Sequence, residues 1–177
     1  MKRAVNRKRL SSGGFTLIEL LTTVVVLGVI AGLAGPSFYS LTVGQNVRGA
    51  SFDLSGALIY ARDEATKRNA NVKILALDSN WNGGWQVVNA SGNILQNQNA
   101  PAKVTITSNV TTSTGCATPC VVFNRAGRIV MTSATTTTTD GKSPSFKLAN
   151  SNGTPGNTTR CVLFDASGRV NTTVTSC

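Results

Sequence analysis

The sequence predicts an α+β fold in which one long N-terminal helix packs on a head made of an antiparallel β-sheet. Two observations predict this fold. Apolar residues follow a helical period up to about residue 68, and short segments with a period of two follow from residue 70 onward. The length of 177 residues suits one domain of ordinary size with an appendage.

The composition limits the chemistry open to this chain. It contains no histidine, which excludes catalytic triads that use an imidazole and HExxH zinc sites. Asp78, Asp140 and Asp165 are not paired with another carboxylate in any acid–base pattern. We therefore expect no enzymatic activity, no cofactor and no metal.

The chain begins with a basic segment followed by an apolar one. Of the formal net charge of +10, five positive charges fall in the first nine residues, whereas residues 15–35 carry a single charge, Glu19. A helix of about 20 apolar residues crosses a bilayer, and upstream positive charges keep the N-terminus in the cytoplasm. We expect a single-pass membrane helix with the rest of the chain outside.

Two ordinary interpretations of this segment leave Glu19 unexplained. They are a secretory signal peptide cut near Ala31 or Ala34, and a plain signal anchor. A carboxylate inside the membrane costs about 2.5–3.5 kcal/mol on insertion scales, so such a group needs a partner. A cut between Gly14 and Phe15 would create an amino group one helical turn before Glu19, in the same or a neighbouring subunit.

The residues at this point are Gly14-Phe15-Thr16-Leu17-Ile18-Glu19-Leu20. This segment resembles the class III signal of type IV prepilins and pseudopilins. The resemblance implies that a prepilin peptidase cuts between Gly14 and Phe15, that Phe15 is N-methylated, that Glu19 serves assembly and that Pro36 kinks the helix. It implies a cleaved leader (1–14), a transmembrane and assembly helix (15–43) and a globular head (44–177).

Beyond Pro36 an amphipathic helix is predicted to about residue 68. Its small and apolar residues recur at spacings of three and four. They are Val43, Val47, Ala50, Leu54, Ala57, Ala61 and Ala65. Lys67 and Arg68 suit the end of this helix, because the helix dipole is negative there, and Asn69 ends the pattern.

Eight short strands are expected after the helix. Their ranges are Val72–Leu77, Trp85–Val88, Lys103–Thr107, Val121–Phe123, Arg128–Thr132, Phe146–Ala149, Arg160–Asp165 and Arg169–Val174. Residues 121–129 and 162–170 share one plan: a strand, then Asn or Asp, then Gly and Arg. Each predicts a β-hairpin with a short glycine-containing loop. Residues 135–140 and 150–159 are low in complexity and are expected to form surface loops.

The four cysteines lie in the part of the chain expected outside the membrane, where the bacterial compartment is oxidising. Four cysteines allow three pairings, and proximity in the sequence favours Cys116–Cys120 and Cys161–Cys177. The alternative is a zinc site. Fifteen residues separate Cys161 from Cys177, which is not the spacing of a zinc knuckle.

The layout of the chain is similar to the ladle-like plan of type IV pilins, above all to the GspH/FimT branch. Residues 60–67 (YARDEATK) and Gly168-Arg169 are similar to motifs of that branch. The resemblance implies a minor pilin of the FimT or FimU type that assists pilus assembly by priming the fibre or at its tip. The alternative is a GspH-type pseudopilin of type II secretion. The implied partners are other major and minor pilins, the prepilin peptidase, the inner membrane with its assembly platform, and, after assembly, the pilus at the cell surface.

The head is basic, with 12 basic and 6 acidic side chains in residues 45–177. This charge is either a solvated surface or a surface that contacts DNA phosphates. Some minor pilins of the FimT type bind DNA and carry a Gly-Arg-x-Arg motif. The matching stretch here is 168–171 (GRVN), so Asn171 replaces the second arginine. If the two hairpin turns face the same way, the candidate DNA contacts are Arg125, Arg128, Arg160 and Arg169.

Overall fold

The computed structural model describes residues 14–99, 101–110, 116–130, 144–151, 159–174 and 177. The leader residues 1–13 and the loop expected at 135–140 lie outside these ranges, as do residues 152–158 of the second expected loop. By its contacts, the chain divides into two units, Met1–Tyr39 and Ser40–Cys177.

The helix α1 (Leu17–Arg68) begins in the first unit and ends in the second. It starts with a capping box, in which Thr16 and Glu19 bond to each other. The Glu19 N–H donates to Thr16 Oγ1 (3.2 Å), and the Thr16 N–H donates to the Glu19 carboxylate (3.3 Å). Pro36 lies within α1, and its kink stays a prediction.

The apolar side chains of α1 in the first unit are exposed. Leu17, Leu27 and Leu33 expose 82%, 64% and 77% of their surface. No helix within the described ranges combines the length and the mean hydropathy that a membrane crossing requires.

In the second unit, one face of α1 is buried as the sequence predicts. The seven residues of the predicted stripe are at most 3% exposed: Val43, Val47, Ala50, Leu54, Ala57, Ala61 and Ala65. The helix ends at Arg68, because Asn69 adopts a positive φ of 50°. The Ala70 N–H then bonds to the carbonyl of Ala65 (3.2 Å), which satisfies one of the last helical acceptors. The predicted end of the helix is confirmed.

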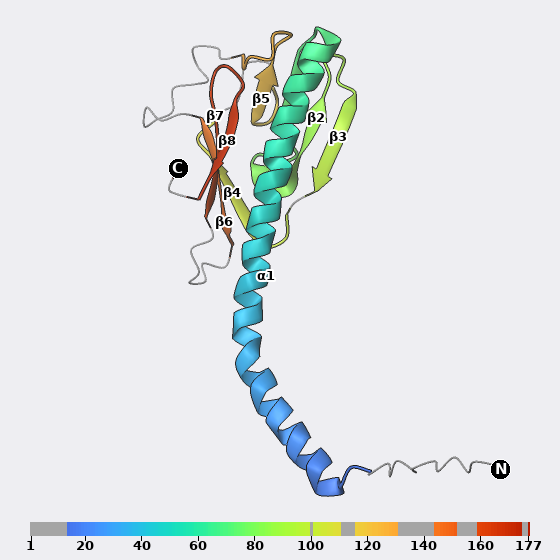
Figure 1. Ribbon diagram of the computed structural model, residues 1–177. Coiled ribbons are helices and arrows are strands. Elements are labelled where there is room, and N and C mark those ends of the chain that lie inside the picture. The colour runs from blue at the N-terminus through green and yellow to red at the C-terminus, as the bar shows by residue number, and fades with distance from the viewer. Residues whose placement is uncertain (1–13, 100, 111–115, 131–143, 152–158, 175–176) are drawn as a thin grey trace, which may run out of the picture. The chain divides into compact units, whose positions relative to one another are not determined.

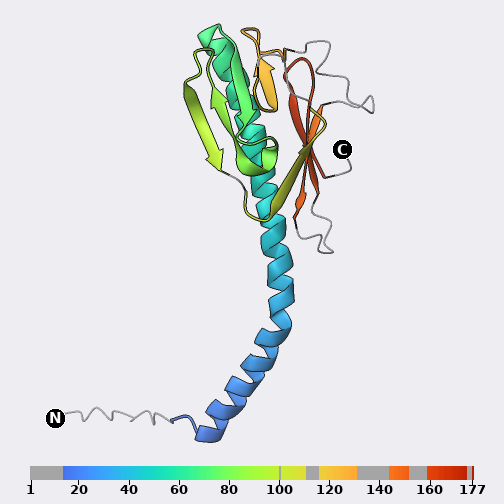
Figure 2. The ribbon, with the colours of Figure 1, turned by 180° about the vertical axis from the view of Figure 1, so that it is seen from behind.

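Two four-stranded sheets complete the second unit, in the orders β3-β2-β1-β5 and β4-β6-β7-β8, and all neighbouring strands are antiparallel. The strands are β1 (Val72–Ala76), β2 (Gly84–Val88), β3 (Ile94–Asn99), β4 (Val104–Ser108), β5 (Cys120–Phe123), β6 (Ser145–Asn150), β7 (Arg160–Phe164) and β8 (Val170–Thr173). The sheets flank the C-terminal part of α1, with β8 on one side and β3 on the other (Figures 1 and 2). The predicted α+β fold is confirmed.

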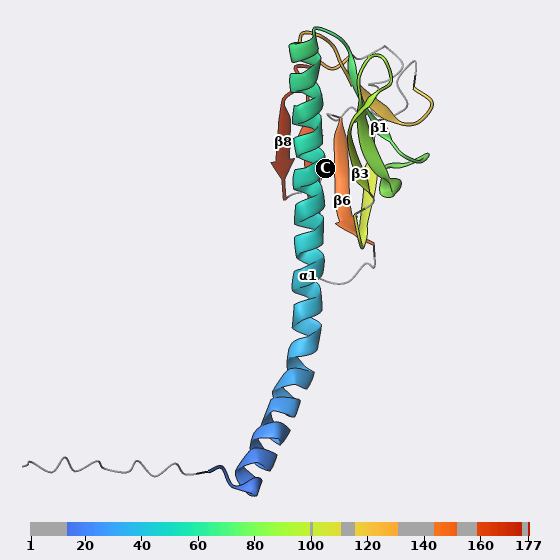
Figure 3. The same cartoon turned by 90° about the vertical axis from the view of Figure 1, so that its right-hand side faces the viewer.

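One core lies between α1 and the two sheets. Trp81, in the short 3₁₀ helix η1 (Trp81–Gly83), meets Phe146 of β6 edge to face, with ring centroids 4.7 Å apart. Phe146 stacks in turn on Phe164 of β7, with centroids 5.5 Å apart. Leu54 of α1 is fully buried in the same cluster. Burial of these apolar side chains holds the helix against both sheets, and Figure 3 shows α1 in profile beside β8 and β6.

Seven of the eight predicted strands are present, each within one residue of its predicted ends. The strand predicted at Arg128–Thr132 is wrong over the described residues 128–130. Only Ile129 pairs, in a single bridge with Phe123. The Asn124 N–H bonds to the carbonyl of Arg128 (2.9 Å) and the Val130 N–H to that of Val122 (2.8 Å), on either side of this bridge. The Ile129 N–H points away from β5 and donates to the carbonyl of Ala166 in another loop (3.2 Å). Residues 131–132 lie outside the described ranges.

Strand β3 (Ile94–Asn99) was not predicted. Its sequence, ILQNQN, is polar and does not alternate. Among the described strands, it lies at the edge of its sheet and pairs with β2, and its side chains are exposed or half-buried. An edge strand of this kind needs no apolar face, so period-two patterning does not detect it.

Candidate functional site

Two hairpin turns in the head have the same backbone hydrogen bonds. In the first turn (124–128), Asn124 Oδ1 accepts the N–H groups of Ala126 (2.9 Å) and Arg128 (3.1 Å). The Gly127 N–H closes this turn on the carbonyl of Asn124 (2.8 Å). Such bonds make Asn and Asp favourable at the start of a turn.

The second turn (165–169) joins β7 to β8. Asp165 Oδ1 accepts the N–H groups of Ser167 (2.9 Å) and Arg169 (3.1 Å), and the Gly168 N–H donates to the carbonyl of Asp165 (2.9 Å). Both glycines have a positive φ, +69° at Gly127 and +77° at Gly168. The predicted repetition of one turn geometry is confirmed.

The two turns lie against each other. A Cβ built on Gly168 would overlap the carbonyl oxygen of Gly127, and the Ile129 N–H bonds to the carbonyl of Ala166. Both glycines are buried. A side chain at either position would therefore push the turns apart, so glycine is needed for close approach as well as for its backbone conformation.

Arg62 of α1 lies against both turns. Its Nε is 3.2 Å from the Cβ position of Gly127 and 3.3 Å from that of Gly168, and Thr66 Oγ1 is 3.0 Å from the former. The C-terminal end of α1 thus contacts both hairpin turns through Arg62 and Thr66. This contact could not be predicted from the sequence, because Arg62 lies on the polar side of the predicted helix and far from both turns in the chain.

The adjacency of the turns brings three of the four candidate arginines to one part of the head. Arg125 and Arg128 belong to the first turn and Arg169 to the second, and all three are exposed. Arg160 stands at the other end of β7, five residues before Asp165, which places it about 16 Å away along an extended strand. Arg160 is therefore not part of this group.

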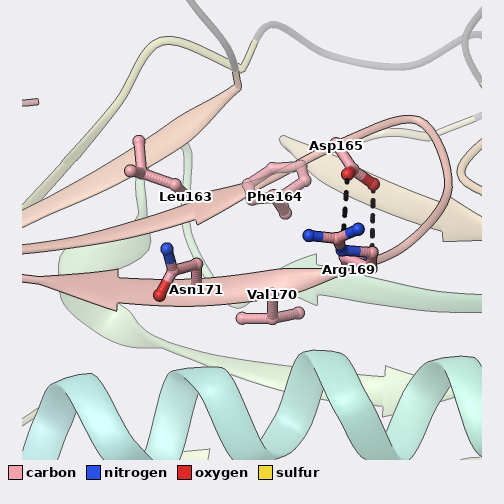
Figure 4. A pocket seen from close by; sticks show the side chains of 6 residues that line it. All are labelled: Leu163, Phe164, Asp165, Arg169, Val170 and Asn171. Carbon is pink, nitrogen blue, oxygen red and sulfur yellow. Dashed lines mark hydrogen bonds and ion pairs between the residues drawn. The ribbon is translucent and has the colours of Figure 1, made fainter.

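The carboxylate of Asp165 faces Arg169 within the second turn (Figure 4). Arg169 Nε lies 4.0 Å from Asp165 Oδ2, and the Ser167 hydroxyl donates to Asp165 Oδ1. The Ser167 hydroxyl, followed by the Arg169 N–H, lowers the pKa of Asp165. The carboxylate therefore stays ionised at neutral pH. Asp165 and Arg169 line an open depression of about 340 Å³, with Leu163, Phe164, Val170 and Asn171 as its other walls.

The processing residues lie at the start of α1. Gly14 and Phe15 precede the helix, and Phe15 is 87% exposed. Glu19 sits in the first turn of α1, where its carboxylate accepts bonds from the N–H and the hydroxyl of Thr16 (3.3 and 3.2 Å). Thr16 was not singled out from the sequence, although Thr-x-x-Glu is the pattern of a capping box.

Two disulfides join the cysteines in the pairs that sequence proximity favoured. The short-loop disulfide joins Cys116 to Cys120, and the long-loop disulfide joins Cys161 to Cys177. All four thiols are used, so the cysteines form no zinc site. No group of three or more metal-ligating side chains occurs among the residues whose positions are described.

Comparison with known proteins identifies families and solved structures that are similar to this chain. The family described as "Type II transport protein GspH" matches residues 50–168, and the "Prokaryotic N-terminal methylation motif" matches residues 9–35. Two crystal structures of the type IV minor pilin FimU from Pseudomonas aeruginosa have the same fold. They share 22% and 21% sequence identity with this chain and give TM-scores of 0.51 and 0.52. The matches cover 71% and 72% of this chain, and 91% and 87% of the FimU chains.

No match was found among curated proteins. The GspH match spans more than half of the chain and includes the C-terminal part of α1 from residue 50, the strands β1 to β7, the first turn and the second turn up to Gly168. Together with the methylation motif at the N-terminus, it shows that the chain belongs to the GspH family of type IV pilin-like proteins, whose members are structural subunits rather than enzymes.

Proposed function

We propose that this chain is a minor pilin of the FimU or FimT type that takes part in assembly of a type IV pilus. The observation that carries the proposal is the methylation motif at residues 9–35, joined to a head that matches the GspH family. The likeness to FimU supports the same fold for the head. The FimT-type assignment rests on the sequence resemblance described above.

The first proposed step is processing. A prepilin peptidase cuts between Gly14 and Phe15 and methylates the new amino group. Residues 15–35 then hold the subunit in the inner membrane by a single pass, with the head in the periplasm. The exposed apolar side chains of this part of α1 and the basic residues before Gly14 support this topology.

The second proposed step is assembly. Glu19 pairs with the positive amino group of a neighbouring subunit, and the assembly platform draws the chain into the fibre. The head then contacts other major and minor pilins, as a subunit that primes the fibre or sits at its tip. The single charge within residues 15–35 supports this role, because an ionised group in an apolar layer needs a partner.

Mass spectrometry of the mature N-terminus tests the processing step. We expect the native protein to begin at a methylated Phe15. Gly14→Leu should leave a heavier, uncut chain in the membrane, whereas Gly13→Ala, next to the cut, serves as the control and should be processed. A native N-terminus at any residue other than Phe15 contradicts the proposal.

A pseudopilin of type II secretion is the alternative within the same family. The family description itself favours it. Deletion of the chain separates the two functions: loss of surface pili with normal protein secretion supports the minor pilin, and the reverse supports the pseudopilin.

A second candidate function is contact with DNA. The observation that favours it is the adjacency of the two turns, which gathers Arg125, Arg128 and Arg169 on one exposed part of the head. Guanidinium groups bind phosphates with loss of condensed counterions, so binding weakens as salt rises.

A mobility-shift assay tests this candidate with the full chain in nonionic detergent and a duplex of about 30 base pairs at about 50 mM salt. Arg128→Ala should weaken binding and reduce its dependence on salt, and Arg160→Ala, outside the group, should change it less. Absence of any shift at this low salt contradicts DNA binding.

A further inference from the structure

The two turns differ at their first residue, although their backbones do the same thing. Asn124 and Asp165 each use one side-chain oxygen, Oδ1, to accept the N–H groups two and four residues later, at 2.9 and 3.1 Å in both turns. A neutral amide therefore builds this turn as well as a carboxylate does. The negative charge of Asp165 is not needed for the turn itself.

The second oxygen of Asp165 has a different contact. Asp165 Oδ2 lies 4.0 Å from Arg169 Nε, whose side chain is 82% exposed. In the first turn, Arg128 occupies the position that corresponds to Arg169, and Asn124 brings no charge to it. Among the described residues, no carboxylate forms an ion pair with Arg125 or Arg128. The two turns thus present their arginines in different electrostatic states.

We propose that Asp165 competes internally for Arg169, so that the first turn supplies most of the attraction for a phosphate polymer. Arg125 and Arg128 are the principal contacts, and Arg169 is released only when the phosphates displace the Asp165 carboxylate. This inference rests on DNA contact, the second candidate function, and concerns how that contact is regulated.

The strength of the competition follows from the geometry. The pair is exposed and its atoms are 4.0 Å apart, so water and salt screen it. An exposed pair of this kind changes an equilibrium constant by about two- to fivefold. Removing the carboxylate should therefore strengthen DNA binding by about that factor, and placing a carboxylate in the first turn should weaken binding by a similar factor.

An exchange of the two side chains between the turns tests the proposal. The variants are Asp165→Asn, Asn124→Asp and the double exchange. Each keeps the oxygen on which its turn depends, so the fold should persist, which a thermal melt by circular dichroism verifies. Binding is measured with the full chain in nonionic detergent and a duplex of about 30 base pairs. Asp53→Asn is the control, because it removes one exposed negative charge from α1 about 14 Å along the helix from Arg62, which contacts both turns.

The expected results concern both affinity and its dependence on Arg169. Asp165→Asn should bind DNA more tightly than the parent and more tightly than Asp53→Asn. Arg169→Ala should cost little in the parent and about two- to fivefold in the Asp165→Asn background. In the double exchange, the larger loss should move from Arg128→Ala to Arg169→Ala.

Two results would overturn the proposal while leaving DNA contact intact. One is equal strengthening by Asp165→Asn and Asp53→Asn, which reflects net charge alone. The other is an equal cost of Arg169→Ala in both backgrounds. If neither the parent nor any variant binds DNA, then the second candidate function fails and this proposal fails with it.

Discussion

Replacement of Gly168 by alanine measures how closely the two turns pack. Gly168 has a φ of +77°, a conformation that costs an L-residue about 1–2 kcal/mol. A Cβ there overlaps the carbonyl oxygen of Gly127, a backbone atom that moves only if its whole turn shifts. Overpacking of this kind adds about 1–3 kcal/mol. We expect Gly168→Ala to lower the free energy of unfolding by about 2–5 kcal/mol in total.

Two other glycines separate the backbone strain from the contact. Gly92 has a φ of +85°, but no atom lies within 4 Å of its Cβ position. Gly92→Ala should therefore cost the strain alone, about 1–2 kcal/mol. At Gly127 the Cβ would meet the side chains of Thr66 (3.0 Å) and Arg62 (3.2 Å), which can rotate away. Gly127→Ala should fall between the other two variants.

Urea unfolding of the full chain in nonionic detergent measures these costs. The fluorescence of Trp81 and Trp85 reports the transition, because the two side chains are only 2% and 1% exposed. The midpoint should fall from Gly92→Ala through Gly127→Ala to Gly168→Ala, with the slope against urea unchanged. The reasoning about the turn contact is refuted if Gly168→Ala is as stable as Gly92→Ala.

Three further predictions concern other parts of the chain. The long-loop disulfide has a sequence separation of 16 and the short-loop disulfide a separation of 4. Replacing both cysteines of the long-loop disulfide by serine should lower the free energy of unfolding by about 3 kcal/mol, and the same change at the short-loop disulfide by about 2 kcal/mol. Urea unfolding of the two double variants measures both costs. Because the Ser167 hydroxyl and then the Arg169 N–H lower the pKa of Asp165, its stabilising contribution is present above the unfolded value of about 3.9 and is lost as the pH falls through the lower folded value. The melting temperature of Asp165→Asn should therefore fall less than that of the parent when the pH is lowered from neutral to acid. An equal fall in both proteins would contradict the assigned contribution of Asp165. Glu19→Ala should be cut and methylated normally yet enter sheared fibres several-fold less than the parent, which immunoblots of fibre and cell fractions compare, and normal incorporation would exclude the assigned pairing.

The parts of the fold that were predictable are those in which burial repeats along the chain. The stripe from Val43 to Ala65 is buried because α1 presents one face to the core, and that face imposes its spacing on the sequence. Seven strands were predicted for the corresponding reason. Strand β3 was missed because an edge strand with exposed side chains imposes no such spacing. The strand expected after Arg128 was wrong over residues 128–130, where pairing with β5 is limited to one bridge and the other side of Ile129 meets a turn, at Ala166, instead of a strand.

In the functional region, the conformation of each turn could be predicted from nearby residues, but the contact between the two turns could not. Each turn could be predicted alone, because Asn124 or Asp165 and the glycine three residues later fix its bonds within five residues. Their adjacency depends instead on strand order. The first turn follows β5 in one sheet, and the second joins β7 to β8 in the other. Nothing near either turn in the sequence specifies that they meet on Arg62.

Three glycines show the same difference between what the sequence predicts and what the structure adds. On the sequence alone, Gly92, Gly127 and Gly168 are equivalent, because each permits a positive φ in a turn. The structure separates them by what a side chain would touch: empty space at Gly92, movable side chains at Gly127 and a backbone oxygen at Gly168. The absence of a side chain at Gly168 is what lets the two arginine-bearing turns lie this close together. The position of Arg169 beside the first turn therefore depends on the absence of a single methyl group, and stability measurements at Gly168 report directly on the site.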